Sequence, residues 1–287
     1  MLIKANGMIG RAVALVLATA LLGALPPASA QVPSAPPQRV VSLGVCADQM
    51  LLALADPSQI ASLSTEARNP AISYLAELAE AYPQGAGGAE ALVGVAPDLV
   101  LADGTTSAAT LELIETLGYP VILLQTVTSL DEAIAQIRLV GTILGRAAEG
   151  EQLASLVEAA RRQAARTNWG DTVVSVRRGG YVPGDNTLMT DLLSVIGLNN
   201  IGEELSGGSG RVPLEVLVAR PPTYLVVPEQ DASPIGGGLA MLDHPALADL
   251  FPPARRMLIP DRLTYCAGPS LPVALRRLAS ELARVTP

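Results

Sequence analysis

Cys46 and Cys266 are the only cysteines in the chain, and both come at points where buried strands are expected to end. Three interpretations of this pair are open. In an oxidising compartment the two would form a disulfide, which requires Cα atoms about 4.4–6.8 Å apart. The thiols could instead face a ligand such as a metal or a haem iron. They could also be two separate small apolar residues.

Several other polar side chains follow predicted strands. Ligands of open α/β sheets bind at the carboxyl ends of the strands, arginines pair with ligand carboxylates, and tyrosines stack on macrocycles or ligate ferric iron. The residues expected to bind a ligand are therefore Cys46, Asp48, Arg68, Tyr181, Arg211, Tyr265 and Cys266. Gln49, residues 103–106 and Gln125 border the same predicted crevice.

Signatures of catalysis are weak. The glycine-rich segments 85–89 and 236–238 lack the third glycine of a dinucleotide loop, and no lysine is placed for a P-loop. His244 is the only histidine, which excludes a multi-histidine metal cage. The enzyme alternative is a secreted α/β thiol hydrolase that uses Cys266 with His244, although no third residue is evident to orient the histidine.

The composition limits the classes of partner. The chain has 287 residues, of which 49% are hydrophobic and 16% charged, and its net charge is -8. This apolar content predicts a folded core rather than disorder. Nucleic-acid binders instead carry clustered basic side chains that displace counterions, so we expect no nucleic acid as a partner.

The N-terminus has the pattern of an export signal. Lys4 and Arg11 precede the uncharged segment 12–25, and the small residues 28–30 follow it. This order predicts a signal peptide at residues 1–30, with an apolar run too short to span a bilayer comfortably. We expect the exported protein to lie in the periplasm. Lys4 is also the only lysine, so every cationic contact of the exported chain must be a guanidinium.

Short apolar runs alternate with helical segments along the rest of the chain. Strands are expected at 40–43, 60–63, 98–102, 121–124, 172–176, 223–227 and 257–259. Helices are expected at 49–55, 70–82, 106–117, 129–144, 187–196, 214–219, 245–250 and 269–285. Because short buried strands that alternate with helices form parallel sheets, the fold class is α/β.

The long helical segment 147–166 divides this α/β pattern into two halves. At 1.5 Å per residue it spans roughly 30 Å, the width of a small domain. The predicted organisation is two α/β lobes with mainly parallel sheets, joined by this single long helix. The expected boundaries are a signal peptide at 1–30, a flexible tether at 31–38, an N-terminal lobe at 39–146, a linking helix at 147–168 and a C-terminal lobe at 169–287.

Several segments, in their order along the chain, carry a resemblance to a known family. They are 39–43, 90–93 with 96–100, 187–200, 213–215 with 221–222, 244–247 and 268–269. Together they resemble the periplasmic substrate-binding proteins of ABC importers for iron siderophores, haem and cobalamin. The similarity extends from about residue 39 to the C-terminus.

The resemblance implies a rigid clamshell without catalytic activity or an intrinsic cofactor. A monomer would capture a ferric siderophore, cobalamin or haem between its lobes and deliver it to an ABC permease in the inner membrane. Glu90 and Glu215 match the family glutamates that contact the permease, one in each lobe. An ordinary acidic residue at a helix start is the alternative interpretation of each.

Overall fold

A computed structural model describes residues 35–85, 88, 90–167, 170–177, 180–208, 210–229 and 245–286. The predicted signal peptide and His244 lie outside these ranges. Residues 32–287 form one unit by their internal contacts, and this unit holds both lobes and the linking helix. Within the described ranges, no helix has the length and hydropathy needed to cross a membrane.

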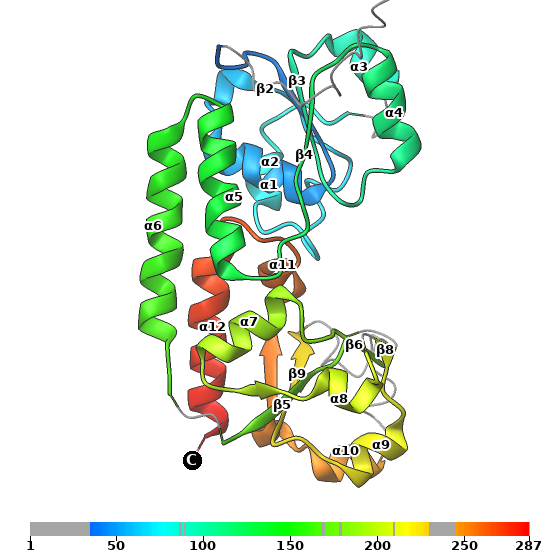
Figure 1. Ribbon diagram of the computed structural model, residues 1–287, viewed down its shortest axis with the longest axis vertical. Helices are drawn as coiled ribbons and strands as arrows, with labels where there is room; N and C mark the ends of the chain where they lie inside the picture. The colour runs from blue at the N-terminus through cyan, green and yellow to red at the C-terminus, as the bar shows by residue number, and fades with distance from the viewer. Residues whose placement is uncertain are drawn as a thin grey trace, which may run out of the picture. The chain divides into compact units, whose positions relative to one another are not determined.

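The first four apolar runs form a parallel sheet in the N-terminal lobe (Figure 1). Its strands are β1 (Val40–Leu43), β2 (Ile60–Ser62), β3 (Leu99–Ala102) and β4 (Val121–Leu123), in the spatial order β2-β1-β3-β4. The helices of this lobe are α1 (Val45–Leu54), α2 (Ala76–Ala79), α3 (Glu90–Val95), α4 (Ala108–Thr116) and α5 (Leu130–Ile143).

The C-terminal lobe repeats this arrangement. Its parallel sheet holds β5 (Thr172–Ser175), β7 (Asn199–Asn200), β9 (Tyr224–Pro228) and β10 (Arg256–Ile259), in the spatial order β10-β9-β5-β7. The short strands β6 (Tyr181–Val182) and β8 (Gly210–Arg211) form a separate antiparallel pair. The helices are α7 (Leu188–Val195), α8 (Gly202–Ser206), α9 (Leu214–Ala219), α10 (Pro245–Leu250), α11 (Asp261–Thr264) and α12 (Leu271–Val285). The α/β class with two parallel sheets is therefore confirmed.

The buried side chains form three hydrophobic clusters, because side chains alternate between the two faces of each sheet. On β1, Val40 belongs to a large cluster and Val41 to a smaller one on the opposite face. On β9, Val226 joins the large cluster and Val227 a third one. Because successive side chains point to opposite faces of a sheet, one face of each sheet contributes to the same large core, and each opposite face has a core of its own.

Helix α6 (Ala147–Ala164) follows α5 and packs against both α5 and α12 (Figure 1). Its buried residues Ala154, Val157 and Ala160 belong to the large shared core. At its end, the Arg166 guanidinium bonds the carbonyl oxygens of residues 163–165. Such cationic side chains stabilise the last carbonyl groups of a helix. Helix α6 ends at Ala164, before the expected end of the linking helix at residue 168.

Several local expectations differ from the structure, and no strand was predicted at the edge strand β7. The segment expected to be helical at 70–82 is mostly turns and holds only the short α2. Helix α1 begins four residues before the expected start at 49. The end of the predicted flexible tether is fixed to the lobe: Pro37 is buried, its carbonyl accepts a bond from the Gln59 amide, and the Gln38 N–H donates to Asp98.

Candidate functional site

A pocket of about 420 Å³ lies where the carboxyl ends of the two sheets meet. From the N-terminal lobe it is lined by the residues that follow β1, β3 and β4, and from the C-terminal lobe by those around α7 and α11. This volume is in the range of small-molecule binding sites. The lining brings together segments from both halves of the chain.

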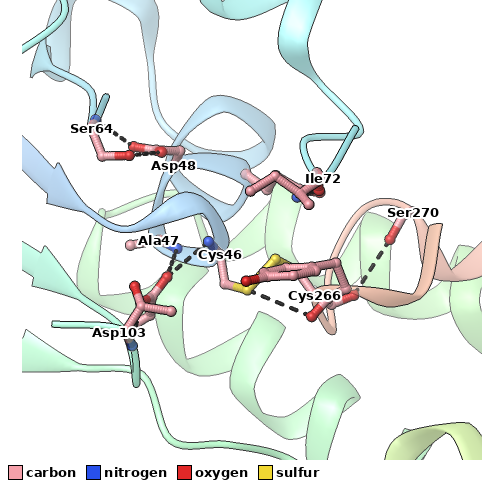
Figure 2. Close-up of a disulfide and its surroundings, with 11 residues drawn as sticks. Cys46, Ala47, Asp48, Ser64, Ile72, Asp103, Cys266 and Ser270 are labelled. Carbon is pink, nitrogen blue, oxygen red and sulfur yellow. Dashed lines mark hydrogen bonds between the residues drawn. A yellow bond between two sulfur atoms is a disulfide. The ribbon is translucent and has the colours of Figure 1, made fainter. Parts of the chain in front are cut away.

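The start of α1 forms one wall of this pocket and depends on a distant carboxylate. Gly44 supplies no side-chain cap and has a φ of 99°, a conformation that favours glycine. Asp103, directly after β3, accepts hydrogen bonds from the N–H groups of Cys46 (2.8 Å) and Ala47 (3.3 Å) (Figure 2). A carboxylate at a helix N-terminus satisfies free donors and is favoured by the helix dipole. Asp103 therefore fixes the position of Cys46.

A second buried carboxylate, Asp48, lies in the first turn of α1 itself. Asp48 accepts a hydrogen bond from the Ser42 hydroxyl at 2.5 Å. It also accepts bonds from the Ser64 hydroxyl at 2.5 Å and from the Ser64 N–H at 2.8 Å (Figure 2). Burial raises the pKa of Asp48, and these hydrogen bonds oppose the rise. Asp48 thus connects β1, α1 and the end of β2 from inside the core, and it does not line the pocket.

The two cysteines form a disulfide in this structure, with an S–S distance of 2.09 Å and Cα atoms 5.2 Å apart (Figure 2). Both residues line the pocket, as does Tyr265 beside them. The Tyr265 side chain is 45% exposed. Because the disulfide joins the start of α1 to the loop between α11 and α12, it links the two lobes directly.

On the C-terminal side, an ion pair fixes the pocket wall. The Arg177 guanidinium lies 2.7 Å from the Asp261 carboxylate and 3.4 Å from the Thr264 hydroxyl, so it connects the end of β5 to α11. Arg177 and Asp103 are the charged residues among the described lining. Since Arg177 is paired and Asp103 accepts local N–H and O–H groups, the described lining presents little uncompensated charge.

Neutral polar groups make up most of the remaining polar lining. Hydroxyl groups come from Thr105, Thr126, Thr128, Thr187 and Thr264, and amides from Gln125, Gln136 and Asn186. Met50 and Met189 add thioether surface from opposite lobes. Such groups donate and accept hydrogen bonds without charge, which suits a ligand that carries amides, hydroxyls or carbonyls.

Of the seven residues expected to bind a ligand, the structure brings Cys46, Tyr265 and Cys266 together at the pocket. The other four do not line it. Asp48 lies on the buried face of α1. Arg68 donates a hydrogen bond to the Tyr82 carbonyl and forms an ion pair with Glu80. Tyr181 and Arg211 face each other across the β6–β8 pair.

Sequence reasoning missed other lining residues. Arg177 directly follows the strand expected at 172–176, so the same strand-end rule that selected Tyr181 could have selected it. Gln136 lies within α5 and Met189 within α7. A rule based on strand ends does not select residues inside helices, so the sequence offered no signal for these two.

The two residues matched to permease contacts begin equivalent helices. Glu90 is the first residue of α3, and Glu215 lies exposed in the first turn of α9. Three residues after each glutamate stands an exposed valine, Val93 at 63% and Val218 at 40%. In Figure 1 both helices lie on the side of their lobe away from α6.

The structure supports neither a thiol hydrolase nor a metal site at the cysteines. A thiol hydrolase needs a free thiolate, whereas Cys266 is held in the disulfide. Within the part of the chain that the structure describes, no group of three or more His, Cys, Asp or Glu side chains is arranged to hold a metal ion. What the pocket offers is recognition by hydrogen bonding and contact.

Comparisons with known proteins agree with this geometry. A cobalamin-binding protein of Halobacterium salinarum is 28% identical over 200 residues, covering 66% of this chain. The chain spans about half the length of that relative (53%). The periplasmic haem-binding protein RhuT from Roseiflexus sp. RS-1 has 26% sequence identity and a TM-score of 0.71, over 86% of this chain and 98% of that one.

A further solved structure shares the fold. The periplasmic vitamin B12 binding protein BtuF of Vibrio cholerae has a TM-score of 0.69 at 15% identity, covering 87% of this chain and 98% of that one. The model of the family described as periplasmic binding protein matches residues 40–254, most of the described chain. With its two parallel sheets and the pocket between them, the chain belongs to the periplasmic binding protein family.

Proposed function

We propose that this protein is the solute receptor of an ABC importer: it binds a small ligand between its lobes in the periplasm and delivers it unchanged to a permease in the inner membrane. The observation that carries the proposal is the pocket, which is built by strand ends of both lobes and combines a mainly apolar surface with neutral hydrogen-bonding groups. Export through the signal peptide at residues 1–30 is part of the same proposal.

The ligand we propose is a metal chelate or a corrinoid. Relatives named for binding cobalamin and haem support this class. Within it, the lining favours a ligand decorated with amides, such as cobalamin or a ferric hydroxamate, over haem. A haem carries two propionates, and the one described arginine of the lining is already paired with Asp261. Tyr265 would contact the face of the ligand or its iron.

Titration of the purified protein with cyanocobalamin, ferrioxamine B and haemin tests the proposal. We expect stoichiometric binding of cyanocobalamin or ferrioxamine B, weaker binding of haemin, and recovery of the intact ligand by mass spectrometry. Replacement of a lining amide, Gln136→Ala, should weaken binding, while Gln163→Ala on the exposed face of α6 should not. Chemical alteration of the ligand, or no binding of any of the three, would contradict the proposed function.

We propose further that Glu90 and Glu215 contact the permease. One carboxylate on each lobe would provide two separated electrostatic contacts with cationic side chains of the partner. The exposed side chains of Val93 and Val218, each three residues later on a helix, would add an apolar contact beside each glutamate.

A further inference from the structure

The disulfide joins two segments that belong to different lobes. Cys46 is the second residue of α1, just beyond the N-terminal sheet, and Cys266 lies between α11 and α12 of the C-terminal lobe. The two are separated by 220 residues in the chain. Besides the chain itself, this bond is a covalent connection between the lobes.

Each cysteine is anchored within its own lobe. The Cys46 N–H donates to Asp103, which also accepts bonds from Ala47 and Thr105. On the other side, the Cys266 carbonyl accepts a bond from Ser270 at 3.4 Å, and the preceding α11 is tied to β5 through Arg177 and Asp261. Because both ends are held, a force that separates the lobes near this point acts on the disulfide.

The other described contacts between the lobes are non-covalent. The Leu130 N–H, at the start of α5, donates to the Asp191 carboxylate on α7 at 2.7 Å. Helices α5, α6 and α12 pack through apolar side chains of the shared core. The hydrogen bond can exchange with water, but the buried core packing is costly to disrupt, so the lobes move relative to each other only while that packing is kept. The disulfide adds a covalent restraint at the pocket, where it keeps its two Cα atoms 5.2 Å apart.

The disulfide is also part of the pocket surface. Cys46 and Cys266 line the pocket, together with Met50, Tyr265 and Ala267 from the segments on either side of the bond. We infer that the Cys46–Cys266 disulfide is a positioning element of the binding site: it holds these residues in place in the ligand-free protein and restricts opening of the lobes to rotation about this point. A restrained opening keeps the empty site close to its binding-competent form.

The first test measures the distance between the lobes without ligand. Spin labels on noncanonical ketone side chains at Leu113 of α4 and Val218 of α9, both exposed, report this distance by pulsed electron resonance. We expect one narrow distribution in the oxidised protein and a broader distribution, extending to longer distances, in the Cys46→Ser/Cys266→Ser variant. Identical distributions in the two proteins would overturn the inference.

A matched control separates restraint from general stability. Leu225→Ala, in the buried core of the C-terminal lobe, lowers thermal stability without cutting the connection between the lobes. We expect its distance distribution to remain as narrow as that of the unmodified protein. A Leu225→Ala variant that broadens as much as the double serine variant would show that lost stability, and not the lost bond, widens the opening.

The second test measures ligand release and rests on the proposed function. Release of cyanocobalamin or ferrioxamine B, followed by stopped flow, should be about tenfold faster from the double serine variant than from Leu225→Ala. Equal release rates would count against the positioning role. Failure of the unmodified protein to bind either probe would instead count against the proposed function, while the distance measurement still decides whether the disulfide restrains the lobes.

Discussion

The two lobes have the same strand order but secure their pocket-facing ends differently. In each sheet the first strand lies between the second and the third, and the fourth is at the edge beyond the third. The N-terminal lobe uses two buried carboxylates, Asp48 and Asp103, that accept N–H and O–H groups. The C-terminal lobe uses the partly exposed ion pair of Arg177 and Asp261.

The similarity between the two lobes includes a short repeated segment, residues 90–97 in one lobe and 215–222 in the other. Glu90, Leu92, Val93 and Pro97 before β3 correspond, at the same spacing, to Glu215, Leu217, Val218 and Pro222 before β9. Leu92 and Leu217 are fully buried, whereas both valines are exposed. The repeat therefore preserves the outer helices, while the pocket-facing loops have diverged. One topology can therefore carry two similar outer helices and one shared, asymmetric pocket.

The largest loss of stability is expected at Gly44, which packs closely against Asp103 at the pocket face of the N-terminal lobe. A Cβ on residue 44 would collide with the Asp103 carboxylate, and the φ of 99° disfavours any side chain there. Gly44→Ala should lower the free energy of unfolding by about 3 to 4 kcal/mol, because strain adds to the loss of buried hydrogen bonds. Urea denaturation measures this loss.

Gly118→Ala is the control for the backbone contribution. Gly118 also has a positive φ, of 79°, but a Cβ there would meet no described atom within 4 Å. This variant should lose only about 1 kcal/mol. Equal losses at the two positions would show that contact with Asp103 contributes nothing to the stability of the lobe.

A smaller effect on stability tests the electrostatic difference between the lobes. The stability contributed by one carboxylate in each lobe, Asp48 and Glu281, should depend on pH in opposite directions. Burial raises the pKa of Asp48 above its ordinary value of 3.8. Between the unfolded and the folded pKa, the folded state binds more protons than the unfolded state. The stability contributed by Asp48 is therefore fully present below the ordinary pKa and is lost as the pH rises through the folded pKa. The destabilisation caused by Asp48→Asn, about 2 kcal/mol, should be greatest at low pH.

Glu281 on α12 of the C-terminal lobe should behave in the opposite way. Burial disfavours its charge, but bonds from Arg284 and the Leu258 N–H outweigh burial and lower its pKa. Its contribution is present above the ordinary pKa and is lost as the pH falls through the folded pKa. Destabilisation by Glu281→Gln, about 1 to 2 kcal/mol, should shrink in acid. Urea denaturation between pH 3 and 7 measures both trends. The predicted contrast would be wrong if the destabilisation caused by the two variants changed in the same direction with pH.

The smallest effect on folding is expected at the repeated outer helices. The double variant Glu90→Ala/Glu215→Ala should keep its stability and ligand affinity to within about 0.5 kcal/mol, because neither glutamate is among the described pocket lining and Glu215 is exposed. Ligand uptake by cells and affinity for the reconstituted permease should fall. Unchanged uptake and permease affinity would refute the docking role, and Glu112→Ala on α4 of the N-terminal lobe is a matched surface control.

Sequence patterns predicted seven of the strands in the two parallel sheets because each of these is a short apolar run. They missed the edge strand β7, which consists of two asparagines and carries no apolar pattern. The runs at 40–43 and 257–259, for example, became β1 and most of β10. Helix ends with local caps were also predictable: Ser129 caps α5 by accepting the N–H of Glu132. Helix α1 was predicted too short because Asp103, distant in sequence, caps its start. The segment expected to be helical at 70–82 begins instead with a turn in which the Asn69 side chain accepts the Ala71 N–H, and a single helical turn follows, closed by the Ser73 N–H to the Asn69 carbonyl.

The sequence by itself determined the α/β class, the two-lobed arrangement and the strands whose ends could bind a ligand, because these follow from local periodicity and composition. Tertiary structure decided which strand-end residues meet. Tyr265 and the two cysteines converge on one pocket, whereas Arg68 turns to backbone carbonyls and Asp48 to buried serines. The physical reason is that a polar side chain must satisfy its hydrogen bonds with whatever partners the packed chain brings near it, and those partners lie far away in sequence.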